Sequence, residues 1–113
     1  MTTDEIVSVE KIMEEYIEAI RPPENIRPQL DIGYKIEAQS VLIFEIRPQW
    51  NDPAIINEHP LAKATYVKSK NEWNVFWKKS DGKWHRYSPQ PAVKTLSEFI
   101  ELTEEDEHHC FWG

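Results

Sequence analysis

The segment from residue 68 to residue 87 alternates basic and aromatic residues. It contains five lysines and three tryptophans, and near its end stands Asp81-Gly82, a dipeptide typical of two-residue hairpin turns. Rings that stack bases and cations that contact phosphates are the two components of many single-stranded nucleic-acid sites. Aromatic residues are also favoured in strands, so packing in a core explains the same pattern.

A two-residue turn at Asp81-Gly82 pairs Ser80 with Lys83 and fixes which side chains share a face. The face expected to pack in the core then carries Trp73, Val75, Trp77 and Trp84. The opposite face carries Phe76, Lys78, His85 and Tyr87, and we interpret it as an exposed binding surface.

The tail brings together ligand types of zinc, in Asp106, His108, His109 and Cys110. Adjacent histidines rarely point at one ion, so a zinc site would also have to recruit a distant histidine. A Cys110 nucleophile with a histidine base is a second reading, and a small buried cysteine beside two aromatics is a third. We favour packing, with Phe111 and Trp112 folding back, and expect no cofactor.

A proline-rich stretch from residue 47 to residue 60 shows no clear period and predicts a long loop. Its candidate contact residues are Trp50, Asn51 and His59. Long loops are often functional, although Ile55 and Ile56 could equally tuck this one against the core.

Charge is distributed unevenly along the 113 residues, whose formal net charge is −7. Residues 61–87 hold seven basic and two acidic residues, a balance of +5, so the rest carries −12. Such a basic block indicates either an anionic ligand on one face or ordinary solvated surface. There is no Walker loop, Gly-x-Gly-x-x-Gly, Gly-x-Ser-x-Gly or His-Glu-x-x-His motif, which argues against the usual enzyme classes.

The location expected from the sequence is the cytoplasm. The longest apolar run, Val41 to Phe44, is far too short for a membrane helix, and no membrane partner is expected. The acidic N-terminus lacks the features of a secretory signal, and Cys110 has no second cysteine with which to form an internal disulfide.

The helices and strands that position these residues are predicted from the spacing of apolar residues along the chain. Apolar residues at steps of three and four predict a helix over 3–21, opened by a Thr2/Glu5 capping box and closed by Pro22-Pro23. Strands are expected near 30–37, 40–47, 61–68, 73–79 and 83–88, followed by a helix near 95–105. We therefore expect a single α+β domain over 1–113, with an N-terminal helix, a five-stranded, mostly antiparallel meander and a C-terminal helix, both helices on one sheet face.

Four stretches carry a family resemblance: Pro60-Leu-Ala-Lys-Ala-Thr-Tyr-Val67, Trp73-Asn-Val-Phe-Trp-Lys78, Lys83-Trp-His-Arg-Tyr87, and Asp106 with Cys110-Phe-Trp-Gly113. The chain resembles a family of small bacterial proteins catalogued as a domain of unknown function, number 3024. The resemblance implies a single-domain bacterial protein in which the tail and the hairpin belong to one unit. It transfers no catalytic residue to any position here.

The sequence favours a non-catalytic binding module whose hairpin face contacts a protein or a single-stranded nucleic acid. The alternative is a metal-binding or thiol-dependent enzyme built on His85, His108, His109 and Cys110, with zinc as its cofactor. A homodimer through the uncovered sheet face is a third possibility.

Overall fold

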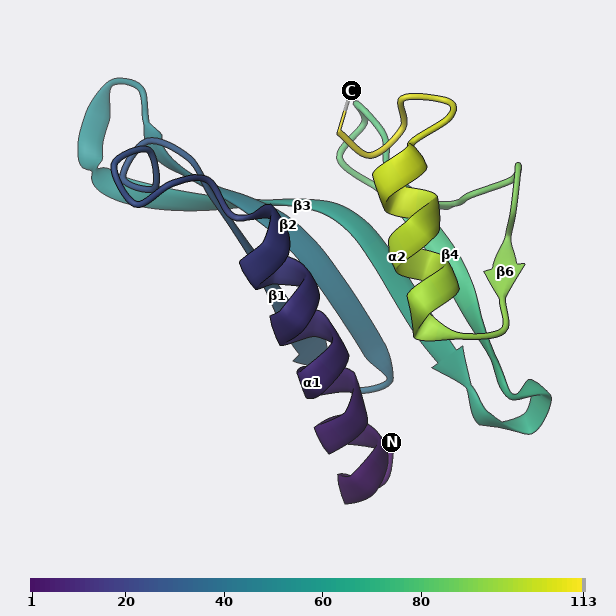
Figure 1. Ribbon diagram of the computed structural model, residues 1–113. Coiled ribbons are helices and arrows are strands. Elements are labelled where there is room, and N and C mark those ends of the chain that lie inside the picture. Colours follow the sequence, from purple (N-terminus) through teal and green to yellow (C-terminus); the bar gives the residue numbers. More distant parts are fainter. Residues whose placement is uncertain (113) are drawn as a thin grey trace.

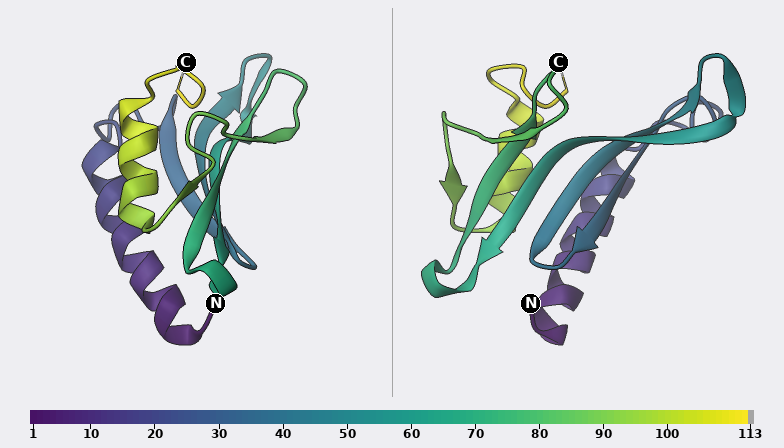
Figure 2. Two further views of the ribbon diagram at one scale, coloured as in Figure 1. Left: turned by 90° about the vertical axis from the view of Figure 1, so that its right-hand side faces the viewer. Right: turned by 180° about the vertical axis from the view of Figure 1, so that it is seen from behind.

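Two α-helices pack on one face of an antiparallel sheet in the computed structural model, which describes residues 1–112 (Figures 1 and 2). Within these residues the elements are α1 (Thr3–Ile20), β1 (Asp31–Glu37), β2 (Ser40–Gln49), β3 (Asp52–Val67), a 3₁₀ turn (Lys68–Lys70), β4 (Glu72–Lys78), β5 (Trp84–Arg86), β6 (Ala92–Val93) and α2 (Leu96–Glu105). The α+β fold and the meander order of β1 to β5 confirm the sequence prediction. A sixth strand was missed because β6, which pairs with β4, has two residues and leaves no period to read.

Helix α1 begins and ends where the sequence indicates. The Thr2 hydroxyl accepts the Glu5 N–H and the Glu5 carboxylate accepts the Thr2 N–H, which completes the capping box. The buried stripe contains Val9, Met13 and Ile17, one helical turn apart, and it faces the sheet.

The core lies between the helices and alternate residues of the central strands. Val41 and Ile43 of β2 pair with Ala64 and Ala62 of β3, and all four side chains are buried on the helix side. Because successive side chains of a strand point to opposite faces, the residues between them lie on the uncovered side of the sheet. We call that side the outer face.

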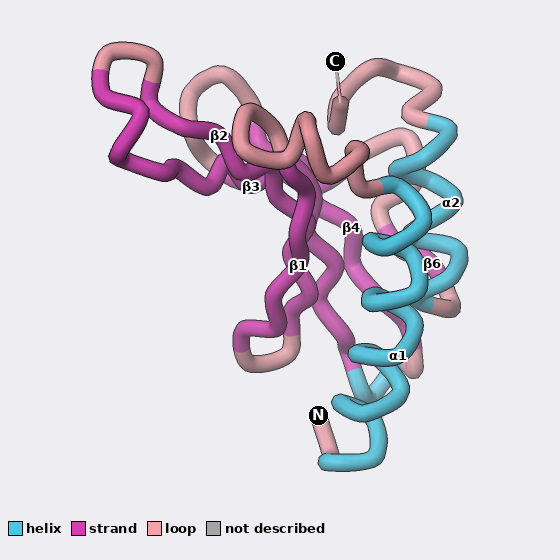
Figure 3. Tube along the Cα trace, turned by 60° about the vertical axis from the view of Figure 1, so that its left-hand side comes forward, coloured by secondary structure: helices cyan, strands magenta, loops and turns pink. Residues whose placement is uncertain are grey.

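The predicted loop at 47–60 is wrong, because β2 and β3 continue through it as one long hairpin that turns at Trp50-Asn51. Residues 47–57, which we call the arm, extend beyond the pairing with β1 and β4 as a two-stranded ribbon (Figures 1 and 3). Pro48 and Pro53 hide the strand period in the sequence, but each is tolerated in a ribbon with free edges.

The hairpin between β4 and β5 has a three-residue loop rather than the predicted two-residue turn. The Lys79 N–H donates to the Lys83 carbonyl at 3.2 Å, and the Gly82 N–H donates to the Lys79 carbonyl at 2.9 Å. Gly82 takes the left-handed φ of +78° that closes such loops. Phe76 pairs with Arg86, Trp77 with His85 and Lys78 with Trp84, one residue away from the predicted register.

Candidate functional site

A continuous row of side chains crosses five strands on the outer face. From β1 to β5 the row contains Lys35, Leu42, Lys63, Phe76 and Arg86, each opposite the next. Cationic and apolar residues alternate along it, so each apolar side chain has a cationic neighbour on both sides. The long side chains of lysine and arginine can cover such apolar neighbours while keeping their charge in water, and Leu42 is buried here although the helices lie on the other face.

Two aromatic rings and three cations meet at the β3–β5 end of this row. The Lys63 ammonium lies 4.8 Å from the centre of the Phe76 ring and 4.9 Å from that of Trp84. The Lys78 ammonium lies 5.5 Å from the Trp84 ring, and the Arg86 guanidinium lies 5.7 Å from the Phe76 ring. All four distances are within the range of cation–π attraction. We call these five residues the cation–aromatic cluster.

Positive charge in the cluster is not neutralised locally. Within residues 1–112, neither Lys63 nor Lys78 has a carboxylate oxygen within 4.0 Å, whereas Lys35, further along the row, is ion-paired with Glu58 at 3.2 Å. Burial lowers the pKa of the Lys63 ammonium, since desolvation disfavours the charged form. The Glu37 carboxylate acts on Lys63 from beyond ion-pair distance, so a negatively charged group that approaches Lys63 does not have to displace an ion-paired carboxylate.

The arginine of the cluster is held in place by neutral groups. Its Nη2 donates to the Asn74 side-chain oxygen at 2.7 Å and its Nε donates to the Pro91 carbonyl at 2.8 Å. Because both acceptors are neutral, the Arg86 charge persists at a fixed position beside Phe76.

Acidic residues are concentrated on the opposite side of the sheet. Helices α1 and α2 together carry ten carboxylates and one lysine. Figure 2 shows both helices on the same face of the sheet, away from the outer face. The helical side is therefore strongly acidic, whereas the outer face carries the cations of the cluster together with carboxylates such as Glu37 and Glu58.

Two of the predicted hairpin residues lie in the cluster and two do not. Phe76 and Lys78 are on the outer face, as expected. The expectation that Tyr87 is exposed is wrong: its side chain is 1% exposed, and its ring centre lies 4.9 Å from that of Phe111. His85 lies beside Trp77, on the opposite face from Phe76 and Lys78, and its Nε2 is 2.8 Å from a carboxylate oxygen of Asp81.

The three residues predicted from the 47–60 segment lie apart from the cluster. Trp50 and Asn51 form the turn at the tip of the arm, and Trp50 is 93% exposed. His59 is exposed near the base of the arm, opposite Glu45.

Sequence reasoning missed Lys63, Trp84 and Arg86. Lys63 was detectable, because Ala62 and Ala64 on either side read as the small buried positions of an alternating strand. The prediction that Trp84 faces the core is wrong, and Trp84 and Arg86 both lie on the outer face, because the extra loop residue inverts the face of every β5 side chain relative to β4.

The tail folds back on the core, as predicted, and Asp106 holds it there. The Asp106 carboxylate accepts the N–H groups of Phe111 at 3.0 Å and Trp112 at 2.9 Å. The Trp112 indole N–H donates to the Thr103 carbonyl at 3.0 Å. This loop packs Phe111 against Tyr87 and so supports the hairpin from behind.

Within the described residues, the predicted metal site and the predicted Cys110 nucleophile lack the geometry that each would need. Among the residues that the structure describes, no three His, Cys, Asp or Glu side chains are placed to hold one metal ion, so His108, His109 and Cys110 do not form a ligand set. Burial and the nearby Asp106 carboxylate raise the pKa of the Cys110 thiol. A nucleophilic cysteine needs the opposite shift, toward the thiolate.

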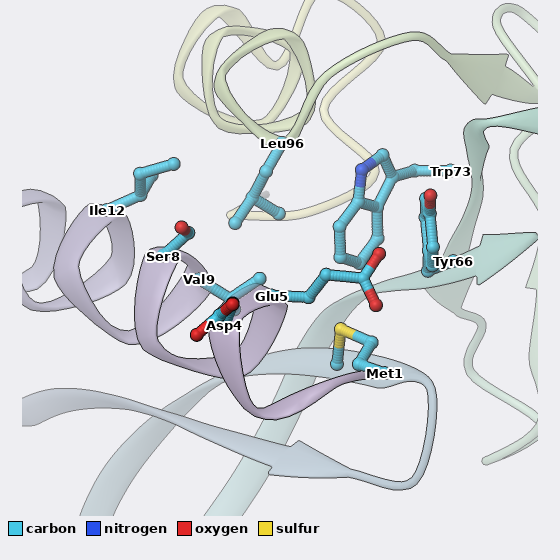
Figure 4. Close-up of a pocket in the computed structure, with 9 residues that line it drawn as sticks. All are labelled: Met1, Asp4, Glu5, Ser8, Val9, Ile12, Tyr66, Trp73 and Leu96. Atoms are coloured by element: carbon cyan, nitrogen blue, oxygen red, sulfur yellow. The ribbon is translucent and has the colours of Figure 1, made fainter. Parts of the chain in front are cut away.

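A cavity of about 340 Å³ lies on the other side of the sheet from the cluster, between the start of α1 and the ends of β3 and β4 (Figure 4). Its walls include Val9, Tyr66, Trp73 and Leu96, and Glu5 points into it. The Glu5 carboxylate is already engaged in the capping box, and Asp4 and Ser8 of α1 are the other polar residues beside these apolar walls.

Comparison with known proteins identifies one family. The family model described as a domain of unknown function (DUF3024) matches residues 1–113, and the chain belongs to that family. No curated protein and no solved structure matches the chain. Neither of the two helices within residues 1–112 is long and apolar enough to cross a membrane.

Proposed function

We propose that this member of the DUF3024 family is a non-catalytic binding module whose cation–aromatic cluster binds single-stranded nucleic acid. The observation that carries the proposal is the position of Lys63 between the rings of Phe76 and Trp84, without an ion-paired carboxylate among residues 1–112. Bases and phosphates alternate along a single strand, and the cluster offers the matching alternation of rings and cations.

The interaction energies favour a nucleic-acid base over a lysine as the group that lies against each ring. A partly exposed cation–π contact contributes about 0.5–1 kcal/mol, whereas a base stacked on an aromatic side chain contributes about 1–3 kcal/mol. When a phosphate draws the Lys63 or Lys78 ammonium aside, the Trp84 ring becomes available to a base. The cation keeps an electrostatic partner, and the ring gains a better one.

Repulsion from the acidic helices does not prevent binding at the outer face. The molecule extends 24 Å along its shortest principal axis, and the Debye length at physiological salt is about 8 Å. Carboxylates on the exposed sides of the helices are therefore largely screened from the far side of the sheet, while contacts within the cluster are not. The same asymmetry orients an approaching polyanion toward the outer face.

The test is fluorescence anisotropy with a labelled oligothymidylate of about 12 nucleotides, a length within the range that one small domain covers. Three phosphates neutralised by the cluster predict a slope of log K against log salt of about −2, which makes binding about 16-fold weaker at about 200 mM salt than at about 50 mM. Lys63→Gln is expected to reduce that slope by about 0.7. Trp84→Leu is expected to weaken binding about tenfold and to leave the slope unchanged, because it removes stacking but no charge.

Lys70→Gln provides the matched control, since Lys70 is an exposed lysine of the same basic segment that lies outside the cluster. Circular dichroism of each variant verifies that the fold is retained. The proposal is overturned if the wild-type protein does not bind, or if Lys70→Gln changes the salt slope as much as Lys63→Gln does. It is also overturned if a polyglutamate peptide binds through the cluster and the oligonucleotide does not, which would assign the surface to an acidic protein segment.

A further inference from the structure

Exposed apolar side chains gather at one end of the molecule. In the described part of the chain, four of the five large apolar residues classed as exposed are Ile26, Trp50, Ile55 and Ile56. Trp50, Ile55 and Ile56 belong to the arm, and Ile26 belongs to the loop of residues 22–30. Figures 1 and 2 place this loop at the same end of the molecule as the arm. We call the loop and the arm together the apolar end.

The arm leaves backbone groups without strand partners on both edges. Pairing of β1 with β2 stops at Ile46, and pairing of β4 with β3 stops at Ala62, so residues 47–57 pair only with each other. A two-stranded hairpin is at best marginally stable in water, and its free edges are templates for further strands. An arm that also exposes a tryptophan and two isoleucines has the composition of a surface that is covered in an assembly.

Charge at the apolar end is balanced, and both of its arginines are ion-paired, Arg47 with Glu45 just outside the arm. Residues 22–30 and 47–57 contain two arginines and two carboxylates, so this end is neutral in a chain of net charge −7. Arg47 is paired with Glu45 at 2.7 Å and Arg27 with Glu24 at 3.9 Å, which leaves no free cation for a phosphate or an anionic lipid.

We infer that the apolar end is the interface of a homodimer, in which the arms of two copies pack against each other about a twofold axis. A second copy is the occupant that the charges favour, because a twofold contact places each surface against itself, so that the acidic helices and the cationic cluster would each face like charge whereas a neutral surface would not. The loop and the arm comprise 20 residues, close to the roughly 20–30 per partner of a standard interface. Trp50 anchors it, as tryptophans do at the centres of interfaces.

The dimer leaves both cation–aromatic clusters open. Lys63 follows the last arm residue by six positions on β3, which separates them by about 20 Å along the strand. Two clusters on one particle can then engage one strand of nucleic acid, and linkage of two sites raises the overall affinity without new contacts. The dimer itself does not depend on the proposed nucleic-acid binding.

The experiment is sedimentation velocity of the full chain, without nucleic acid, from about 1 to about 200 μM, the range in which a modest interface assembles. The wild-type mass is expected to double from 13.4 kDa as concentration rises. The double variant Trp50→Ser, Ile56→Ser is expected to remain at 13.4 kDa over the whole range. Val7→Ser is the matched control, because Val7 is the fifth of these exposed residues, 59% exposed on α1, and its loss should leave the dimer intact.

A wild-type protein that stays monomeric throughout overturns the inference. A dimer that survives in the arm variant also overturns it and moves the interface elsewhere, and a mass that grows beyond the dimer rules out a closed twofold contact. Because Trp50 and Ile56 are exposed in the single chain, the arm variant should keep the far-UV circular dichroism of the wild type.

Discussion

Replacing Asp106 tests the contact that holds the tail against the core. Asp106 follows the last residue of α2 with a left-handed φ of 41°, and its side chain is buried. Its carboxylate accepts two backbone N–H groups, those of Phe111 and Trp112. Two physical effects therefore act at this residue. Its backbone conformation favours glycine, whereas its carboxylate accepts two N–H groups that few other side chains could accept together.

The two effects predict different rankings of variants. A hydrogen bond to a charged group contributes about 1.5–3 kcal/mol, so Asp106→Ala, which removes both bonds and keeps the Cβ, should lower the free energy of unfolding by about 3–6 kcal/mol. Asp106→Gly loses the same bonds but removes a Cβ from the left-handed region, which returns about 1–2 kcal/mol. Domains of this size are stable by about 5–15 kcal/mol, so the alanine variant should be close to unfolding.

Urea denaturation followed by circular dichroism measures all three proteins. The expected order of stability is wild type, then Asp106→Gly, then Asp106→Ala, and the neighbouring exposed Glu105→Ala should stay within about 0.5 kcal/mol of wild type. A glycine variant as stable as the wild type would refute the reasoning, because it would mean that backbone conformation, not the carboxylate, decides stability at this position.

Two further predictions concern β1. The Arg21 guanidinium holds the pKa of Asp31 below its usual value, so Asp31→Asn should destabilise the protein at pH 7 by about 1 kcal/mol. The difference between variant and wild type should shrink as pH falls below about 4, where the carboxylate of the unfolded chain becomes protonated, and it should vanish once pH is below the lowered pKa of the folded protein; a constant difference from pH 7 to pH 2 in thermal melts would contradict the ion-pair account. A Cβ at Gly33 would lie 3.0 Å from two atoms of the buried Phe44 ring, so Gly33→Ala should cost about 1–3 kcal/mol in urea denaturation. An unchanged midpoint would show that the ring moves aside freely.

The parts of the fold that the sequence predicts are those set by local signals. The Thr2/Glu5 capping box and Pro22-Pro23 bound α1 because both act within a few residues. The continuation of β2 and β3 into the arm depends on pairing between residues such as Arg47 and Asn57. No local pattern predicts this pairing, because three prolines interrupt the segment. Residues 47–57 also lack the buried face that gives other strands their alternation, since most of them are exposed on both faces of the ribbon.

The β4 residues of the candidate site were predictable from local sequence, whereas the β5 residues were not. Phe76 and Lys78 share a face because they lie two residues apart on one strand, which any register preserves. The faces on which Trp84 and Tyr87 lie depend on the length of the turn. Asp81-Gly82 fits a two-residue loop and the last two positions of a three-residue loop equally well. One residue decides which of these two rings faces the lysines, and local sequence does not contain that information.

The position of Lys63 connects the fold to the proposed function. Ala62 and Ala64 are buried on the helix side of β3, so the pleat of the strand places Lys63 on the outer face whatever the hairpin does. Its pairing with Phe76 follows from the β3–β4 register, and the three-residue loop then sets Trp84 on the same face. Removing Lys63 from between the rings would require a one-residue shift that also turns Ala62 and Ala64 away from the helices. The cluster is thus maintained by the same packing that stabilises the core.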